Sequence, residues 1–326
     1  DTMLQSYSLD ERQGVHGLKP QAREFLAAGF WEEDREKGKK RLSELEKDVL
    51  YLYNAKDAAY TARLCMIYRP WQLEDNVREM YNNILIPLAN VLNHAQYDGV
   101  TVNRKLLNYF AVKWGQLYLE KEEELQFLAN SYGWPGDDPL NLQSPKQLAR
   151  FLYDILLLPG GPSTDKEHLE ALKGKHPFID KLLDFRHLSH IYDSYITSPA
   201  QYLKDDNKFH PIPKQHGTKT GRLSYTKPAV QTVPQVYDSL YGRIREMYIG
   251  DTEDYEIMEA DYGKAEIWTA QGYSKDKQML IDLLSGDYHT KVAAQTTEKP
   301  ESEITPEERR DAKAVTFGTM YAIGER

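Results

Sequence analysis

Three long stretches of the sequence carry apolar residues three and four positions apart, the spacing of one face of an α-helix. The stretches are 42–66, 73–95 and 104–132. Each is far longer than an ordinary strand, so the first half of the chain is expected to be built from packed helices. Pro87 predicts a kink in the second stretch. A cluster of Gly, Pro and Asp at 133–139 ends the third, and Ser144 with Pro145 predicts the cap and first turn of the next helix.

The texture changes after Ser198 and Pro199, where turn residues and short apolar alternations replace the helical pattern. The run at 255–262 predicts a strand, followed by a helix from about Lys264. The sequence therefore predicts a mixed, helix-rich α+β fold in which helical and strand-rich regions follow one another.

Composition excludes several classes of protein. The 326 residues include 41 Lys and Arg, 50 Asp and Glu, and a single cysteine, Cys65. One cysteine forms no internal disulfide and no cysteine-based zinc site, which favours a reducing, cytoplasmic setting. No apolar run approaches the roughly 18 residues of a membrane helix, so no membrane partner is expected.

The net charge of −9 hides a basic region. Between positions 208 and 245 there are seven cations and one carboxylate, Asp238. The cations are Lys208, Lys214, Lys219, Arg222, Lys227, Arg243 and Arg245. A basic region of loops and strands is typical of a surface that meets phosphates, although a solvated basic surface has the same composition.

The segment 305–321 predicts a helix that could hold a nucleoside triphosphate. Thr305 and Glu308 have the spacing of a capping box, with Pro306 at the first helical position. Four side chains then follow at steps of four, which places them along one helix face: Arg309, Lys313, Phe317 and Tyr321. Two cations one turn apart suit a polyphosphate and two aromatic rings beyond them suit a base or sugar. An ordinary amphipathic helix has the same pattern.

Asp261 closes the predicted strand at 255–262, just before a helix. A carboxylate in that position is a common ligand of Mg²⁺ beside phosphates, although most single aspartates are solvated or cap helices. The turn at 218–224 has only three residues between Gly217 and Gly221, so it does not form a phosphate loop of the Walker type. It can still present Arg222 to a nucleic-acid backbone or base edge.

Together these segments resemble family A DNA polymerases. TKTGRLSYTKPAVQTVP at 218–234 is similar to the TGRLSS-x-x-P-x-x-Q-x-x-P segment of that family. DYGKAE at 261–266 is similar to motif A, and RRDAKAVTFGTMY at 309–321 to motif B on the fingers helix. DYHT at 287–290 corresponds to the family's D-I-H-T, and SPKQL at 144–148 and STDKEHLEAL at 163–172 resemble thumb segments. The motifs are collinear, which makes the resemblance specific.

The resemblance implies roles for individual residues. Asp261 would bind the catalytic Mg²⁺ ions, and Glu266 would be the steric gate that disfavours a 2′-hydroxyl. The implied ligands of the dNTP are Glu266, His289, Arg309, Lys313, Phe317 and Tyr321. Lys313 would also be catalytic. The implied contacts to primer–template DNA are Lys219, Arg222 and Gln231, the last two in the minor groove.

The front of the chain resembles a 3′–5′ proofreading exonuclease. DTMLQSY at 1–7 is similar to the second exonuclease motif, HGLK at 16–19 follows it as in the family, and YNAKD at 53–57 is similar to the third motif. The resemblance implies Asp1 and Asp57 as metal ligands. Tyr53 lies one helical turn before Asp57, from where its phenol could orient a water.

The implied domains are an exonuclease remnant of RNase H-like fold at 1–70, a helical thumb at 71–204, a partial palm at 205–273 and partial fingers at 274–326. Several positions depart from the family pattern, among them Lys264 in place of Gln and Trp268 in place of Arg. These departures indicate a divergent, phage-encoded member, acting in a bacterial or phage-infected cell.

Two motifs of the family are absent from the sequence: the palm His-Asp-Glu and the first exonuclease motif. Two-metal phosphoryl transfer needs a second carboxylate, so we expect a piece of a longer DNA polymerase that is inactive in isolation. Its expected partners are primer–template DNA, dNTPs and the remaining polymerase segment or a processivity factor. One subunit of a split polymerase and a non-catalytic primer–template-binding protein are the alternatives.

Overall fold

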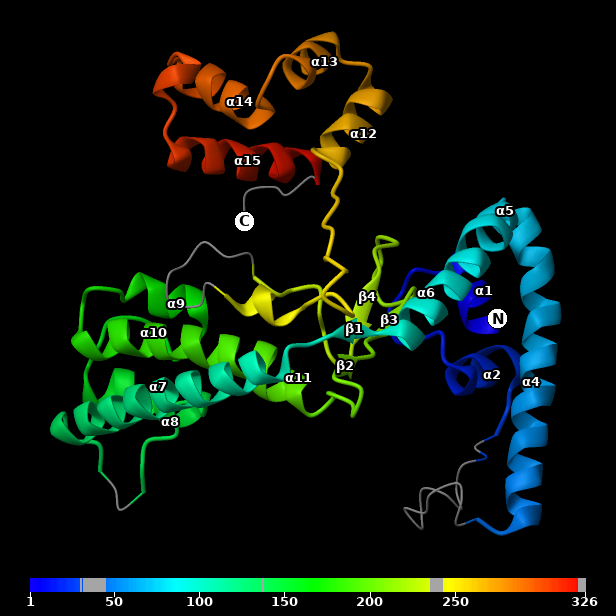
Figure 1. Ribbon diagram of the computed structural model, residues 1–326, viewed down its shortest axis with the longest axis horizontal. Coiled ribbons are helices and arrows are strands. Elements are labelled where there is room, and N and C mark those ends of the chain that lie inside the picture. The colour runs from blue at the N-terminus through cyan, green and yellow to red at the C-terminus, as the bar shows by residue number, and fades with distance from the viewer. Residues whose placement is uncertain (30, 32–44, 136–137, 235–242, 322–326) are drawn as a thin grey trace. The chain divides into compact units, whose positions relative to one another are not determined.

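A computed structural model describes residues 1–29, 31, 45–135, 138–234 and 243–321. The chain divides into two compact units, Asp1–Ile257 and Met258–Arg326 (Figure 1). The helix-rich, mixed fold expected from the sequence is confirmed. The domain boundaries at 70, 204 and 273 stay predictions.

Helices dominate the described part of the first unit. They are α1 (Thr2–Leu9), α2 (Leu18–Leu26), α4 (Lys47–Glu74), α5 (Arg78–Met80), α6 (Ile86–Asp98), α7 (Arg104–Ser131), α8 (Pro145–Ala149), α9 (Lys166–Ala171), α10 (Pro177–Tyr192) and α11 (Ser198–Ala200). Wider π-helical turns occupy Tyr81–Leu85, Arg150–Ile155 and Asp193–Thr197, and a short 3₁₀ turn occupies Ile244–Met247. No described helix is both long enough and apolar enough to cross a membrane.

The second unit contains four α-helices in its described residues. They are α12 (Ala265–Ser274), α13 (Lys277–Leu284), α14 (Tyr288–Thr297) and α15 (Pro306–Met320), with a 3₁₀ turn at Glu301–Glu303. Ile267, Leu283 and Tyr288 form its small buried cluster. This cluster joins α12, α13 and α14, and Met320 of α15 packs against it.

Short strands connect the helices of the first unit. β1 (Val100–Thr101) pairs antiparallel with β2 (Lys208–Phe209), and β3 (Ile212–Lys214) pairs antiparallel with β4 (Ser224–Thr226). Val100 lies opposite Phe209, and Ile212 lies opposite Thr226. The β3–β4 hairpin carries the basic turn that the sequence analysis singled out.

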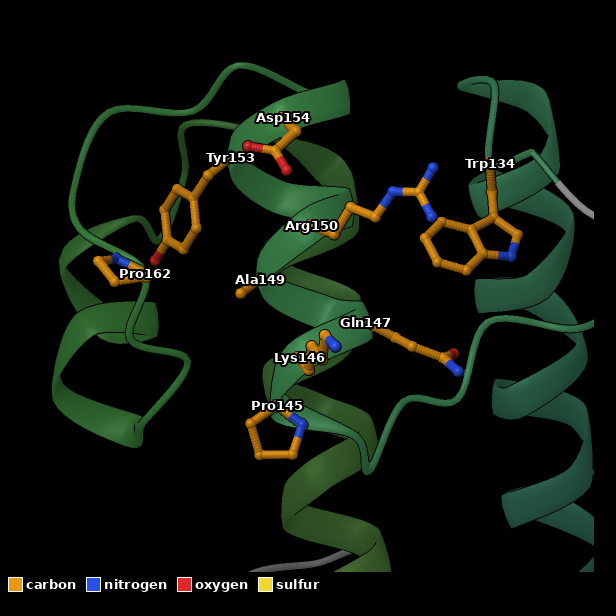
Figure 2. A pocket seen from close by; sticks show the side chains of 9 residues that line it. All are labelled: Trp134, Pro145, Lys146, Gln147, Ala149, Arg150, Tyr153, Asp154 and Pro162. Carbon is orange, nitrogen blue, oxygen red and sulfur yellow. The ribbon is translucent and has the colours of Figure 1, made fainter.

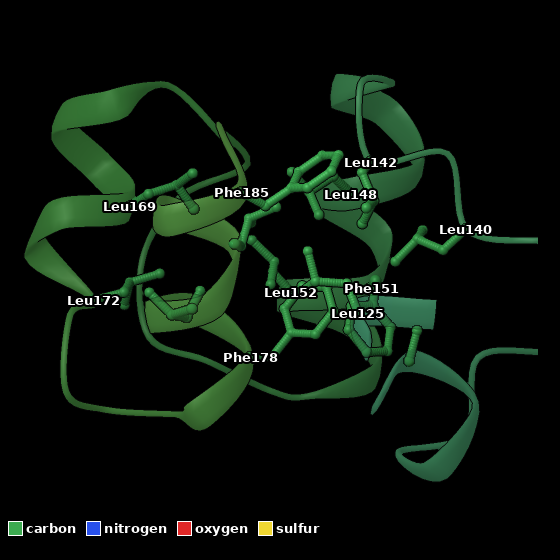
Figure 3. Close-up of a cluster of buried hydrophobic side chains, with 13 residues drawn as sticks. Leu125, Leu140, Leu142, Leu148, Phe151, Leu152, Leu169, Leu172, Phe178 and Phe185 are labelled. Atoms are coloured by element: carbon green, nitrogen blue, oxygen red, sulfur yellow. The ribbon is translucent and has the colours of Figure 1, made fainter. Parts of the chain in front are cut away.

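Two buried hydrophobic clusters lie around α7 and α10 of the first unit. In one, α7 packs against α10 through Leu107, Phe110 and Leu188, which lie with Phe209 of β2. The other gathers apolar side chains from α7 to α10, with the rings of Phe151 and Phe178 edge to face at 4.7 Å (Figure 3). Long helices with one apolar face form here because each gains most of its stability from such packing.

The cap predicted at Ser144 is confirmed, and the structure adds a cap at Asn103. Asn103 Oδ1 accepts a hydrogen bond from the backbone N–H of Leu106 at 3.1 Å and so begins α7. Ser144 Oγ accepts from the N–H of Gln147 at 3.4 Å, with Pro145 at the first position of α8. Side-chain caps satisfy backbone donors that have no partner inside the helix.

The predicted helix at 73–95 is interrupted instead of continuous. α4 ends at Glu74, and Asn76 adopts a left-handed conformation with φ 57° before α5 begins at Arg78. A π-helical turn then precedes α6, whose first turn contains Pro87. A wider turn at this point accommodates the proline ring, which would clash with the carbonyl four residues earlier in a regular helix.

The strand predicted at 255–262 is wrong. This segment has no regular secondary structure, and Tyr255, Ile257, Met258 and Tyr262 are all more than half exposed. An extended segment becomes a strand only when a neighbour completes the hydrogen-bonded ladder, and no described residue does so here. Alternation in the sequence therefore identified an extended segment without a sheet to join.

Replacing Phe178 by Ala tests the core shown in Figure 3. Phe178 is fully buried, so the cavity and the lost apolar contacts are expected to lower the free energy of unfolding by about 3–5 kcal/mol. Urea unfolding followed by circular dichroism measures the change. Phe127→Ala, at a ring 71% exposed on α7, is the matched control and should change stability by roughly 0.5 kcal/mol or less. Equal effects of the two substitutions would contradict this assignment of the core.

Candidate functional site

The helix α15 begins as the sequence predicts. Thr305 Oγ1 accepts a hydrogen bond from the N–H of Glu308 at 3.2 Å, and Glu308 Oε2 accepts from the N–H of Thr305 at 2.9 Å. Lys299 also pairs with Glu308, and these hydrogen bonds lower the pKa of Glu308 to about 2. The capping box fixes where the helix starts and thus which residues share its faces.

The four predicted side chains lie along one face of α15 and its last turn. Lys313 Nζ is 6.0 Å from the ring centroid of Phe317. The rings of Phe317 and Tyr321 stack at 6.4 Å with an interplanar angle of 22°. Arg309 lies one turn before Lys313. The face therefore presents positive charge first and two parallel aromatic rings beyond it.

The N-terminus of α14 lies against the basic end of this face. Asp287 caps α14 by accepting a hydrogen bond from the N–H of Thr290 at 3.1 Å. The same carboxylate accepts two hydrogen bonds from Arg309, at 2.6 Å from Nε and 3.1 Å from Nη2. The Arg309 guanidinium, together with the Thr290 donors, holds the pKa of Asp287 well below its usual range.

His289, the second residue of α14, is buried close to Arg309 and Lys313. Its ring is 5% exposed and lies 5.8 Å from the ring of Phe317, and Nδ1 is buried without a hydrogen-bond partner. Burial lowers the pKa of His289; the Asp287 carboxylate opposes that effect, and the positive charges of Arg309, Lys313 and Lys264 add to it. The surroundings therefore favour the neutral imidazole.

Lys264 is a further cation that the sequence analysis recorded only as a departure from the family. Its Nζ donates to the carbonyl of Gly286 at 2.8 Å, which ties the start of α12 to the start of α14. Its backbone is left-handed with φ 62°, a conformation that costs a residue with a Cβ about 1 kcal/mol or more. Neither this contact nor the Asp287–Arg309 pair is visible in a local spacing, because each joins residues 22 positions apart.

Asp261 and Glu266 flank Lys264. Asp261 is exposed in the segment before α12, and Glu266 lies half-buried in the first turn of α12. An exposed carboxylate fits a hard cation such as Mg²⁺ as one ligand. Within the described ranges, however, no three His, Cys, Asp or Glu side chains come together as a metal site.

The predicted DNA contacts lie on and after the β3–β4 hairpin. Lys219 and Arg222 are exposed in its turn, where Gly221 adopts φ 77° and the Thr218 hydroxyl donates to the carbonyl of Arg222 at 2.6 Å. Gln231 folds back on β4: its Oε1 accepts from the N–H of Tyr225 at 2.9 Å. The structure thus brings the three residues into one loop region, with the Gln231 amide already bonded to backbone.

The residues of the exonuclease-like corner come from three helices. Tyr53 and Asp57 lie one turn apart on α4, and Asp1 Oδ1 caps α1 by accepting from Met3 N–H at 2.9 Å. Lys19 of α2 pairs with the Asp57 carboxylate and lies 4.4 Å from the centroid of the Tyr53 ring. The helical placement of Tyr53 and Asp57 is confirmed, and their metal-binding role stays a prediction.

A pocket of about 800 Å³ lies beside α8, and none of the predicted site residues lines it (Figure 2). The guanidinium of Arg150 lies 5.7 Å from the centroid of the Trp134 ring. Figure 2 shows these two side chains pointing toward each other. Tyr153 Oη donates to the carbonyl of Ser163 at 2.6 Å. These contacts hold the pocket's walls together, and nothing in them selects a particular ligand.

Asp287→Asn should separate the ion pair from the helix cap, because Asn keeps an oxygen for Thr290. The low pKa of Asp287 means that the pair stabilises the fold above about pH 4 and that this contribution is lost as the pH falls further. The pair is partly exposed, so we expect a loss of about 0.5–1 kcal/mol at pH 7. Urea unfolding at pH 7 and at about pH 3 measures it.

The difference between the two proteins should be smaller at the lower pH, because the contribution is lost progressively as the pH falls toward the lowered pKa of Asp287. Asp311→Asn, which removes an exposed carboxylate of α15, is the control and should show little change at either pH. A deficit of Asp287→Asn that persists undiminished in acid would rule out the ion pair as its source.

The chain is similar in sequence to known DNA polymerases. The sequence profile of DNA polymerase family A matches residues 113–326. DNA polymerase I of Bacillus subtilis (strain 168) is 32% identical over 264 residues, which cover 78% of this chain and 29% of that protein. DNA polymerase I of Bacillus caldotenax is 30% identical over 341 residues, covering 100% of this chain and 37% of that protein. The chain thus spans less than two fifths of the length of these two relatives.

A solved structure has the same fold. The POL domain of Pol1 from M. smegmatis, in complex with DNA primer-template and dNTP, superimposes with a TM-score of 0.80. The similarity covers 98% of this chain and 53% of that chain, at 24% sequence identity. With a profile match over most of its length and relatives at 30% identity or more, the chain belongs to DNA polymerase family A.

Proposed function

We propose that this chain is the part of a DNA-directed DNA polymerase that binds the incoming dNTP and grips the primer–template. The observation that carries the proposal is the face of α15, where cations and then aromatic rings lie in line beside the N-terminus of α14. A triphosphate along this face meets positive charge, and its nucleoside meets the rings.

The residues divide the work of nucleotide binding between them. Arg309 and Lys313 donate charge-assisted hydrogen bonds to phosphate oxygens, and His289 becomes a further donor when it is protonated. Phe317 and Tyr321 offer a stacked pair of rings to the sugar and the base pair. Glu266 serves as the steric gate at the 2′ position, which favours deoxynucleotides.

Asp261 supplies one ligand of Mg²⁺ in this proposal. The ion, when bound, neutralises phosphate charge during nucleotidyl transfer. Asp261 fits because its carboxylate is exposed just before α12, in the same unit as the triphosphate-binding residues. The other carboxylates of a two-metal site are not among the described residues around it. Lys313 acts beside the ion as the proposed catalytic cation.

The β3–β4 hairpin is the proposed contact to primer–template DNA. Lys219 and Arg222 are exposed in its turn, and Gln231 follows in the same loop region. Basic side chains in a turn suit phosphate oxygens and the minor groove, whose degenerate acceptor pattern lets every correct base pair fit. The related POL domain of Pol1 was solved with DNA primer-template and dNTP, which supports the same two partners here.

The proofreading activity is the part of the proposal with the narrowest support. Asp1, Tyr53 and Asp57 are expected to act at the exonuclease metals, and α1 and α4 pack against each other. Asp57 is neutralised by Lys19 in this structure, so Lys19 must give way before Asp57 can hold a cation. The phage origin stays a prediction. The split polymerase and the non-catalytic binding protein also stay predictions, since both would use the same nucleotide- and DNA-binding residues.

Removing the cations of the α15 face tests nucleotide binding directly. Arg309→Ala and Lys313→Ala should each weaken the affinity of chain 1–326 for a dNTP by roughly 10- to 100-fold, the value of a charge-assisted hydrogen bond. Equilibrium dialysis with labelled dNTP gives the affinity. Arg310→Ala is the matched control, because Arg310 is exposed and lies off this face, near Glu307. Equal losses in all three variants would point to general charge and not to this face.

The neutral state of His289 predicts a pH dependence. Its pKa is lowered in the free protein, whereas a bound triphosphate favours the imidazolium, so binding takes up a proton. Affinity for dNTP should therefore rise as the pH is lowered from about 8 toward 6. His289→Gln should lose that rise while keeping the titration of the ligand itself. A slope that survives in His289→Gln would assign the proton to another group.

A further inference from the structure

The N-terminal segment of the chain holds the loop that leads into the DNA-binding turn. Tyr7 Oη donates a hydrogen bond to the carbonyl of Thr218 at 2.9 Å. Gln13 Nε2 donates to the carbonyl of Gly217, also at 2.9 Å. These bonds join residues more than 200 positions apart, and the proposed function uses neither Tyr7 nor Gln13.

Aromatic contacts and a buried amide fix the loop from both sides. The ring of His16 lies edge to face with Tyr7 at 5.6 Å and with His216 at 6.2 Å. His16 is itself buried, and its Nδ1 lies 2.9 Å from Ser6 Oγ. On the other side, the buried Gln215 donates from Nε2 to the carbonyl of Leu85 at 2.9 Å.

The loop transmits its position to the turn beyond it. Thr218 is held through its carbonyl by Tyr7, and its own hydroxyl donates to the carbonyl of Arg222 at 2.6 Å. Gly217 packs so closely on β4 that a Cβ there would come within 2.0 Å of Ser224 Oγ. A shift of the 217–218 carbonyls therefore moves the turn that carries Lys219 and Arg222.

We propose that Tyr7 and Gln13 are positioning residues for primer–template binding. Their hydrogen bonds hold the 217–218 backbone, and through it they place the cations Lys219 and Arg222 against the DNA. This inference rests on the proposed function, in which the hairpin turn contacts DNA. It makes the N-terminal segment part of the polymerase grip on the duplex, in addition to any role of that segment in proofreading.

A double-mutant cycle on DNA affinity tests the proposal. Fluorescence anisotropy measures the binding of a labelled primer–template duplex to chain 1–326 at several salt concentrations. Tyr7→Phe removes only the hydroxyl, and Gln13→Leu removes only the amide. Each should weaken binding by roughly three- to tenfold, the effect of one lost hydrogen bond. Tyr97→Phe, at a tyrosine 82% exposed on α6, is the control and should bind as the unaltered chain does.

The background of Arg222→Ala supplies the decisive comparison. If Tyr7 acts by placing Arg222, Tyr7→Phe should cost less than about twofold once Arg222 is gone, because coupled residues are not additive. Tyr7→Phe should also lower the slope of log affinity against log salt by about one counterion, since one cation no longer binds close to the DNA phosphates. If the hydroxyl had a purely structural role, Tyr7→Phe would weaken binding equally with and without Arg222, and the salt slope would stay the same.

The possible results distinguish a failure of the positioning role from a failure of the proposed DNA contact. A full, additive effect of Tyr7→Phe in the Arg222→Ala background, or no effect of Tyr7→Phe and Gln13→Leu at all, overturns the positioning role while leaving the DNA contact in place. Undiminished binding by both Lys219→Ala and Arg222→Ala overturns the proposed DNA contact, and the positioning role with it. Hydrogen exchange at the amides of 217–222 should quicken in Tyr7→Phe, and unchanged protection there would also contradict the proposal.

Discussion

The bidentate contact between Asp287 and Arg309 joins the N-terminus of α14 to the basic end of α15. Without it, Arg309 would be a flexible surface cation and its distance from His289 would vary. Because the same carboxylate caps α14, the position of Arg309 is tied to the backbone of a helix and not only to another side chain. Beside this contact His289 is buried against Phe317, and Phe317 stacks on Tyr321 one helical turn further along the chain.

The same contact limits how much charge the corner offers. Asp287 neutralises part of Arg309, so Lys313 and Lys264 carry much of the uncompensated charge that a triphosphate would meet. Burial and three nearby cations lower the pKa of His289, and the Asp287 carboxylate only partly offsets them. A bound anion would compensate the positive charges and would also favour the protonated form of His289. The charge of the ligand is therefore the property to which these residues respond.

Local features were predictable from the sequence and long-range ones were not. The capping box at Thr305, the cap at Ser144 and the spacing of Lys313 and Phe317 depend on residues within one or two helical turns. The pairing of Asp287 with Arg309 and the bond from Tyr7 to Thr218 depend on how distant segments pack, which no periodicity encodes. The strand at 255–262 failed for the related reason that a strand needs a partner.

The contacts of the N-terminal segment with the 217–218 loop are made to backbone carbonyls, not to side chains. In each of these hydrogen bonds only the donor is a side chain. The position of the acceptor is set by the path of the loop backbone. These bonds also fall where the loop has least freedom, because Gly217 packs against Ser224 and Thr218 is bonded to Arg222. A polar contact to a constrained backbone places a neighbouring cation with less entropy to lose than a contact to the flexible cation itself. The fold therefore holds Lys219 and Arg222 through the chain that carries them and leaves both residues exposed for the proposed contact with DNA.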